Sequence, residues 1–198
     1  MDKEKKKERR GAAIELREVG KGARPVVEGY ALVFGTPSDR LPFIETIERG
    51  ALDGVIERSD VMAVVDHDIS RGVLARCKQG TGSLTLTVDE RGLRYSFELP
   101  NTELGRTLAE NIRRGEITES SFAFTVETEE WTRPDADGQP WRRTIRKIAE
   151  LFDISPVYTA AYSSTSVDMR GKEEAEDKAR RLAEAMTAID EATKAIDI

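Results

Sequence analysis

Apolar and polar side chains alternate along much of residues 26–154, and this period of two constrains the fold more than any other feature. Successive side chains on a β-strand point to opposite faces, so an alternating segment buries one face of a sheet. Residues 83–88 (SLTLTV) and 93–99 (LRYSFEL) alternate in this way around the turn residues 89–92. This pattern predicts a β-hairpin, and the chain as a whole is predicted to be β-rich.

Further strands are expected where apolar residues cluster on either side of this hairpin. They are predicted at residues 26–34, 61–65, 73–77, 117–126 and 141–154. Residues 61–65 (VMAVV) are continuously apolar, which is typical of a buried strand. We expect Ser155-Pro156 to interrupt the last strand, because proline cannot donate to a ladder.

Two helical segments are expected within the same region. Residues 44–58 are predicted to pass into a short helix. A second helix is predicted after Thr102, a polar capping residue, with Leu104, Leu108 and Ile112 on one face and Gly115 beyond its end. A β-rich α+β domain with about eight strands and one or two helices results.

The two ends of the chain differ in composition from this domain, which we place at residues 25–170. Residues 1–24 start with six basic and three acidic residues in the first ten, and a polar, disordered lead-in is expected. Residues 171–198 are rich in Ala and Glu, with apolar residues every three or four positions. They are predicted to form a surface or partner-binding helix, with a frayed tail as the alternative.

One histidine, His67, and one cysteine, Cys77, limit the chemistry of the chain. They exclude an internal disulfide, a Cys-rich zinc site and any multi-histidine metal site, and we expect no cofactor. The net charge of −6 disfavours a nucleic-acid partner. No secretory signal is expected. The sequence contains no run of about 18 apolar residues, so no membrane span is expected either.

His67 lies between two aspartates directly after the predicted buried strand. It is a candidate general base, because only histidine has an unperturbed pKa near neutrality, and an exposed loop histidine is the alternative. Cys77 lies in an alternating strand and is expected to be a buried thiol rather than a nucleophile.

Ser120 and Ser121 lie where a strand is predicted to begin. A nucleophilic serine needs a base to take its proton and a third group to hold that base. Glu150 and Asp153 on the return strand are candidates for this third group. They lie on opposite faces by parity, so at most one of them suits a given site, and both could equally be solvent-facing acids.

Residues 28–170 resemble the prohead, or capsid maturation, proteases of tailed bacteriophages. The resemblance rests on short blocks that keep their order across about 140 residues. The blocks are Glu28-Gly29-Tyr30-Ala31 with Phe34-Gly35; Glu48-Arg49-Gly50-Ala51-Leu52; Asp66-His67-Asp68; Asp89-Glu90-Arg91-Gly92-Leu93; Leu99-Pro100-Asn101-Thr102; Arg114-Gly115-Glu116-Ile117 with Ser121-Phe122-Ala123-Phe124; and Leu151-Phe152-Asp153-Ile154-Ser155-Pro156-Val157 with Ala161-Tyr162.

This resemblance implies a fold similar to the herpesvirus assembly proteases: a β-barrel-like core with surrounding helices. It implies His67 as the catalytic histidine, Ser121 as the nucleophile and Glu150 as the acid, with Asp153 left open as the third member. The family usually has glycine where Glu119 and Ala123 stand. Because the chain has no second histidine, the Ser/His/His arrangement of the herpesvirus enzymes is impossible here.

The function implied by the resemblance is that of a viral prohead serine endopeptidase. Such an enzyme would cleave the major capsid protein, scaffold segments and itself inside the procapsid, in the host cytoplasm, and self-association is left open. One alternative is a non-catalytic assembly protein that retains the fold, which Glu119 and Ala123 favour. The other is a cysteine hydrolase that uses Cys77 with His67.

Overall fold

The computed structural model describes residues 7–18, 24–38, 41–134, 136 and 139–158, and most of this backbone lies in strands. These residues form ten strands, two α-helices and two 3-10 helices. In chain order they are β1 (Glu8–Glu18), β2 (Pro25–Val33), β3 (Ile44–Ile47), η1 (Arg49–Leu52), α1 (Val55–Arg58), β4 (Asp60–Ala63), η2 (Ile69–Arg71), β5 (Ala75–Lys78), β6 (Thr81–Gly82), β7 (Leu84–Val88), β8 (Gly92–Glu98), α2 (Glu103–Arg113), β9 (Glu119–Thr132) and β10 (Arg142–Val157).

The strands pair in the order β6-β5-β4-β10-β9-β1-β2-β8-β7, and β3 adds to β10 beside this series. The predicted β-rich fold with few helices is confirmed. The predicted barrel is not shown, because no ladder among the described residues joins β6 to β7 and closes the series. The predicted helix at residues 171–198 lies outside the described residues. No helix in the described part of the chain is long and apolar enough to cross a membrane.

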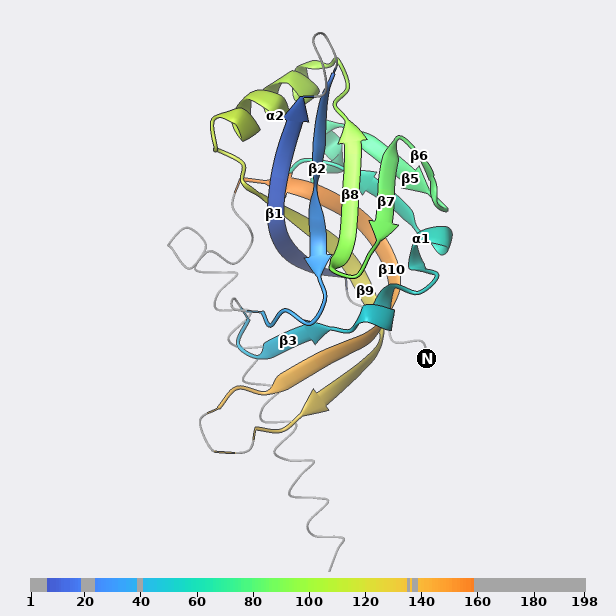
Figure 1. Cartoon of the computed structure of the whole chain (residues 1–198), viewed down its shortest axis with the longest axis vertical. Helices are drawn as coiled ribbons and strands as arrows, with labels where there is room; N and C mark the ends of the chain where they lie inside the picture. The colour runs from blue at the N-terminus through green and yellow to red at the C-terminus, as the bar shows by residue number, and fades with distance from the viewer. Residues whose placement is uncertain (1–6, 19–23, 39–40, 135, 137–138, 159–198) are drawn as a thin grey trace, which may run out of the picture.

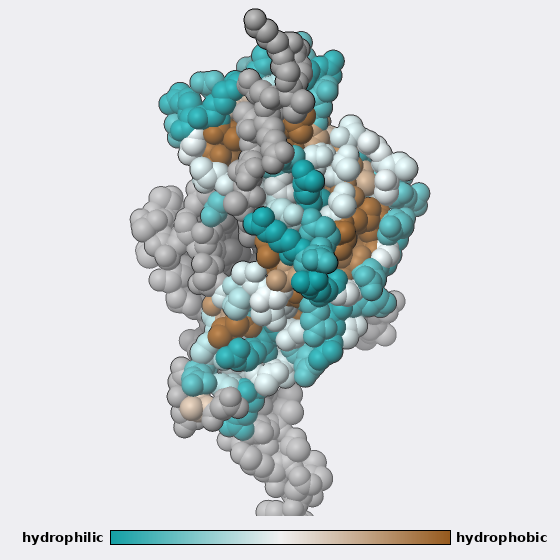
Figure 2. Space-filling view, in the orientation of Figure 1, coloured by the Kyte–Doolittle hydropathy of each residue, from teal (hydrophilic) through white to brown (hydrophobic). Residues whose placement is uncertain are grey.

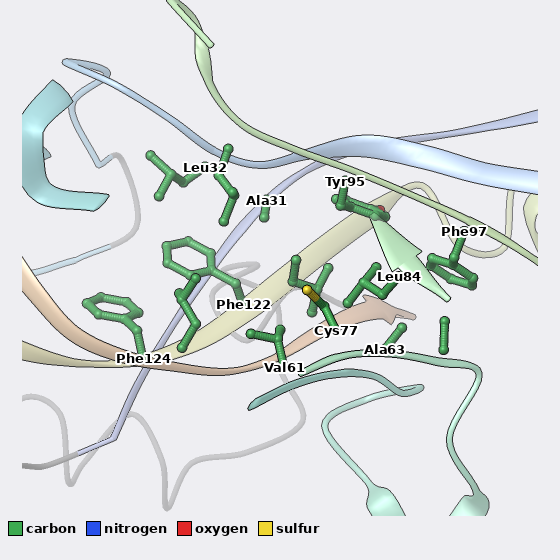
Figure 3. Close-up of a cluster of buried hydrophobic side chains, with 14 of the residues drawn as sticks. Ala31, Leu32, Val61, Ala63, Cys77, Leu84, Tyr95, Phe97, Phe122 and Phe124 are labelled. Carbon is green, nitrogen blue, oxygen red and sulfur yellow. The ribbon is translucent and has the colours of Figure 1, made fainter. Parts of the chain in front are cut away.

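The series of strands folds back on itself and encloses the core between two layers. Figure 1 shows β1, β2, β8 and β7 side by side, with β9 and β10 crossing behind them. In Figure 3, Leu32 and Tyr95 of the first layer lie across from Phe122 and Phe124 of the second. Figure 2 shows much hydrophilic surface on the outer side, as expected for strands that alternate.

Strand β1 connects the two layers. Its first half pairs with β9, from Glu8 opposite Phe124 to Ala13 opposite Glu119, and its second half pairs with β2. The expected lead-in is therefore a strand over residues 8–18. The polar, basic residues at its start did not predict a strand from the sequence pattern. The strand forms there because a ladder is made by backbone N–H and C=O groups and not by side chains.

Two local predictions are confirmed and one is wrong. The helix after Thr102 is α2, and the Thr102 hydroxyl accepts a hydrogen bond from the Gly105 N–H at 3.2 Å. The hairpin of residues 83–99 is the antiparallel pair β7–β8. Pro156 does not interrupt the last strand: β10 runs to Val157, and the Pro156 carbonyl accepts the Asp66 N–H at 3.1 Å.

The pairing of β9 with β10 is the longest antiparallel ladder in the described sheet, and it is not regular. Its register shifts at four places, the last two between Ile148 and Glu150 and between Leu151 and Asp153. Each shift puts unequal numbers of residues opposite one another, as in a β-bulge. Residues on one side of a shift therefore point to a different face than simple alternation predicts.

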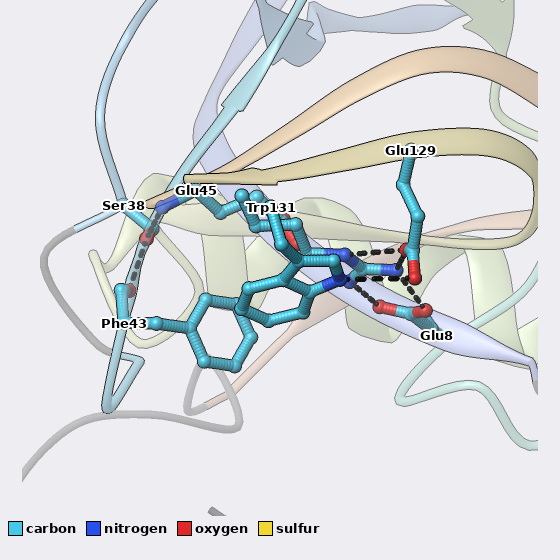
Figure 4. A network of polar contacts seen from close by, with 7 residues as sticks. Glu8, Ser38, Phe43, Glu45, Glu129 and Trp131 are labelled. Carbon is cyan, nitrogen blue, oxygen red and sulfur yellow. Dashed lines mark hydrogen bonds and ion pairs between the residues drawn. The ribbon is translucent and has the colours of Figure 1, made fainter. Parts of the chain in front are cut away.

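A buried guanidinium joins four strands at one end of the sheet (Figure 4). Arg143 of β10 donates hydrogen bonds to Glu8 of β1 at 2.6 and 2.8 Å, to Glu45 of β3 at 2.7 Å and to Glu129 of β9 at 2.7 Å. Burial alone would lower the pKa of Arg143, but the hydrogen bonds and charges of the three glutamates raise it. The side chains of Arg143 and Glu45 are 7% and 2% exposed, so neither charge has water as a substitute partner.

We expect Arg143→Met to lower the free energy of unfolding by about 3–5 kcal/mol, because removing one member of a buried ionic group leaves the others unpaired. Arg146→Met is the matched control. Arg146 lies on the same strand and pairs with Glu130, but both side chains are half-exposed, and a loss of at most about 1 kcal/mol is expected. Urea unfolding of both variants checks this, and equal losses would contradict it.

Candidate active site

Strands β9 and β10 place two polar side chains on the face of the sheet that points away from the core. Ser121 pairs with Ser155, and Ala123, two residues further along β9, pairs with Asp153. Cross-strand partners project from the same face, so Ser121 and Asp153 are diagonal neighbours. The gap between such neighbours, about 7–8 Å between Cα atoms, suits one bridging side chain.

His67 reaches this face from a loop that follows β4. Strand β4 runs parallel to β10, and the ladder continues beyond it through the Val64 N–H on the Ile154 carbonyl at 3.2 Å. Asp66 and His67 then adopt positive φ angles of 53° and 59°, which turn the chain over β10. Aspartate and histidine are among the residues that tolerate this conformation. The His67 N–H donates to the Ser155 hydroxyl at 3.2 Å and fixes the loop on β10.

The imidazole of His67 bridges the serine and the aspartate. Its Nε2 lies 2.7 Å from Ser121 Oγ, and its Nδ1 lies 2.5 Å from Asp153 Oδ1. An ionised carboxylate only accepts hydrogen bonds, so Nδ1 carries the proton and donates to Asp153. Nε2 is then free to accept the proton of the Ser121 hydroxyl, which is the arrangement that a general base needs.

The carboxylate of Asp153 is buried but well supplied with hydrogen-bond donors. Its side chain is 8% exposed and that of His67 is 5% exposed. Burial raises the pKa of Asp153, but the hydrogen bond and charge of His67, the Ser155 hydroxyl at 2.9 Å and the charge of Lys7 together lower it. Asp153 is therefore held ionised at neutral pH, as a partner of an imidazolium must be.

The acid beside His67 is Asp153 and not Glu150. Glu150 is exposed, and the structure places it outside the group formed by His67, Ser121 and Asp153. Alternation does not hold between the two acids, because a register shift lies between Leu151 and Asp153. The contact of His67 with Asp153 corrects the assignment of Glu150 by resemblance.

The other two nucleophile candidates belong to the core. Ser120 is 0% exposed and, by alternation along β9, points to the same face as Phe122. Cys77 of β5 is 1% exposed among apolar side chains (Figure 3), and burial raises the pKa of its thiol. A raised pKa disfavours the reactive thiolate, so the cysteine alternative finds no support.

Groups of histidine, cysteine and carboxylate side chains that could hold a metal ion do not occur among the described residues. The site as it stands contains one hydroxyl, one imidazole and one carboxylate in a hydrogen-bonded row. Such a row defines the serine-hydrolase class of site, in which the imidazole activates the hydroxyl for attack on a carbonyl.

Comparisons with known proteins narrow this class. Residues 12–179 match the family model of the Caudovirus prohead serine proteases. The chain belongs to this family, as the resemblance in the sequence indicated. No curated protein matches the chain.

A solved structure with a similar fold is the capsid assembly protease gp21 of bacteriophage T4. The two structures superpose with a TM-score of 0.51 at 11% sequence identity, over 79% of this chain and 100% of the other. At this identity the likeness concerns the fold.

We expect Asp153→Asn to slow the reaction of Ser121 with a fluorophosphonate by about 10³–10⁴-fold, because the amide cannot hold His67 in the right tautomer. In this reaction the Ser121 oxygen bonds to phosphorus, fluoride leaves and His67 accepts the proton. Glu150→Gln is the control and should react within about two-fold of the unsubstituted protein. Intact-mass kinetics measure both, and the opposite order would restore Glu150 as the acid.

Proposed function

We propose that the chain is a serine endopeptidase that cleaves capsid and scaffold proteins during procapsid maturation. The observation that carries this proposal is the position of His67, within hydrogen-bond distance of both Ser121 and Asp153. Membership of the prohead protease family supports the same function.

The proposed mechanism is acyl transfer through an acyl-enzyme. Ser121 Oγ attacks the carbonyl carbon of the scissile peptide while His67 Nε2 takes its proton. The tetrahedral intermediate collapses, the C–N bond breaks and the imidazolium returns the proton to the leaving amine. Water then attacks the ester with His67 again as base, which releases the acid product and restores Ser121. Asp153 stabilises the imidazolium in both halves.

The donors that stabilise the oxyanion come from outside β9 in this proposal. Ser121 pairs with Gly11 of β1 on one side and with Ser155 of β10 on the other. In an interior antiparallel strand, each backbone N–H is bonded to one of the two neighbours, so that of Ser121 is already used. Glu119 and Ala123 lie in the same two ladders, so their backbone N–H groups are also used for pairing. The family's usual glycines would therefore not supply a free amide at these positions.

The proposed substrates follow from the family and not from the geometry of the site. They are the major capsid protein, scaffold segments and the enzyme itself, cut within the procapsid in the host cytoplasm. The T4 protein of similar fold is a capsid assembly protease, which supports this substrate class. Self-association is part of the same proposal.

We expect Ser121→Ala to abolish processing of the phage's own capsid and scaffold proteins in co-expression, because the hydroxyl is the nucleophile. Ser120→Ala and Cys77→Ala are the controls. Each removes one buried group and should keep processing while lowering stability by about 1–2 kcal/mol. Gel analysis and mass spectrometry of the products measure the outcome. Processing that survives Ser121→Ala would favour the non-catalytic assembly protein.

A further inference from the structure

An ammonium group lies against the oxygen of Asp153 that His67 leaves unused. Lys7 Nζ is 3.2 Å from Asp153 Oδ2, whereas His67 Nδ1 and the Ser155 hydroxyl both contact Oδ1. His67 and Lys7 are the titratable groups that face this carboxylate in the described part of the chain. The two sides of Asp153 are therefore occupied by different partners, one of them catalytic in the proposed function.

The fold brings Lys7 to this place through the start of β1. Glu8, the next residue, pairs with Phe124 of β9, and the same ladder puts Gly11 opposite Ser121. The Glu8 carboxylate accepts two hydrogen bonds from Arg143, which anchors the backbone directly after Lys7. The first residues of β1 therefore lie beside Ser121, and the hydrogen bonds of Glu8 with Arg143 hold the start of this strand in place.

A second contact holds the ammonium itself. Lys7 Nζ lies 4.6 Å from the centroid of the Phe152 ring, at a distance typical of a cation–π interaction. Phe152 precedes Asp153 on β10, so both contacts of Lys7 come from adjacent residues of one strand. The Lys7 side chain is 45% exposed and that of Asp153 is 8% exposed, so the cation lies between a buried carboxylate and the solvent.

We propose that Lys7 is a positioning residue of the active site, which holds the Asp153 carboxylate in the orientation that His67 requires. This inference rests on the proposed function and adds a residue to it. Lys7 acts through Asp153 and does not touch the reacting atoms. Its cation also favours the ionised carboxylate, so its loss makes protonation of the His67–Asp153 pair easier.

The test compares Lys7→Met, Lys7→Arg and Lys147→Met in the full chain, with a fluorophosphonate as the probe of Ser121. Lys147 is the matched control: it is 47% exposed and pairs with Glu127 at 2.8 Å. The second-order rate constant of labelling is measured from pH 5 to pH 9 at low and high salt, and thermal unfolding shows that each variant is folded.

We expect Lys7→Met to lower the rate constant at neutral pH by about two- to five-fold, the usual effect of a half-exposed ion pair. The acid limb of the pH profile should move to higher pH, because loss of the cation makes uptake of a proton by the hydrogen-bonded His67–Asp153 pair easier. The difference from the unsubstituted protein should shrink at high salt. Lys7→Arg should keep the original profile, and Lys147→Met should change nothing.

Several outcomes would contradict the role of Lys7 without contradicting the proposed function. They are an unchanged pH profile in Lys7→Met, faster labelling in that variant, or an equal loss in Lys7→Arg. Failure of the proposed function has another signature, since the unsubstituted protein would then be labelled no faster than Ser121→Ala, and the role of Lys7 would fall with it.

Discussion

The pairing of β9 with β10 is the interaction on which the rest of the structure depends. It sets Ser121 and Asp153 diagonally on one face, at a spacing that one imidazole spans. The far edge of β10 also receives β4, and the continuation of that parallel ladder guides the chain to His67. These two ladders position all three groups, and the backbone N–H groups of Asp66 and His67 hold the loop on β10 by hydrogen bonds to the Pro156 carbonyl and the Ser155 hydroxyl.

At two places in the described sheet, a buried charge is paired with the first residue of β1 or with the residue before it. Glu8 contributes to the group around Arg143, and Lys7 contributes to the group around Asp153. A buried ion needs a partner because water is excluded, so the two contacts give the first residues of β1 a fixed place. Adjacent residues of opposite charge therefore connect a structural cluster with the candidate active site.

The sequence predicted the secondary-structure elements that are determined by residues close together in the chain. The cap at Thr102 and the spacing of Leu104 and Leu108 sufficed for α2, and strict alternation sufficed for the β7–β8 hairpin. Strand β1 was missed because its pairing is a backbone property. Asp153 was left open because the register shifts of β10 change which face a residue occupies, and a sequence does not show where a ladder shifts. The His67–Ser121 contact joins residues 54 positions apart, so the resemblance to a family indicated it and local pattern did not.

The position of β1 between the two layers has a consequence for the proposed self-cleavage. In the described sheet this strand joins one layer to the other, and Lys7, the residue before it, contacts the acid of the candidate site. In the proposed function, self-cleavage before residue 7 would leave the contacts of Lys7 and Glu8 in place. A cut within residues 8–18 would free the segment that carries Lys7 and weaken the join between the layers. Under the proposed function, the position of the first self-cleavage would therefore decide whether capsid maturation continues or stops.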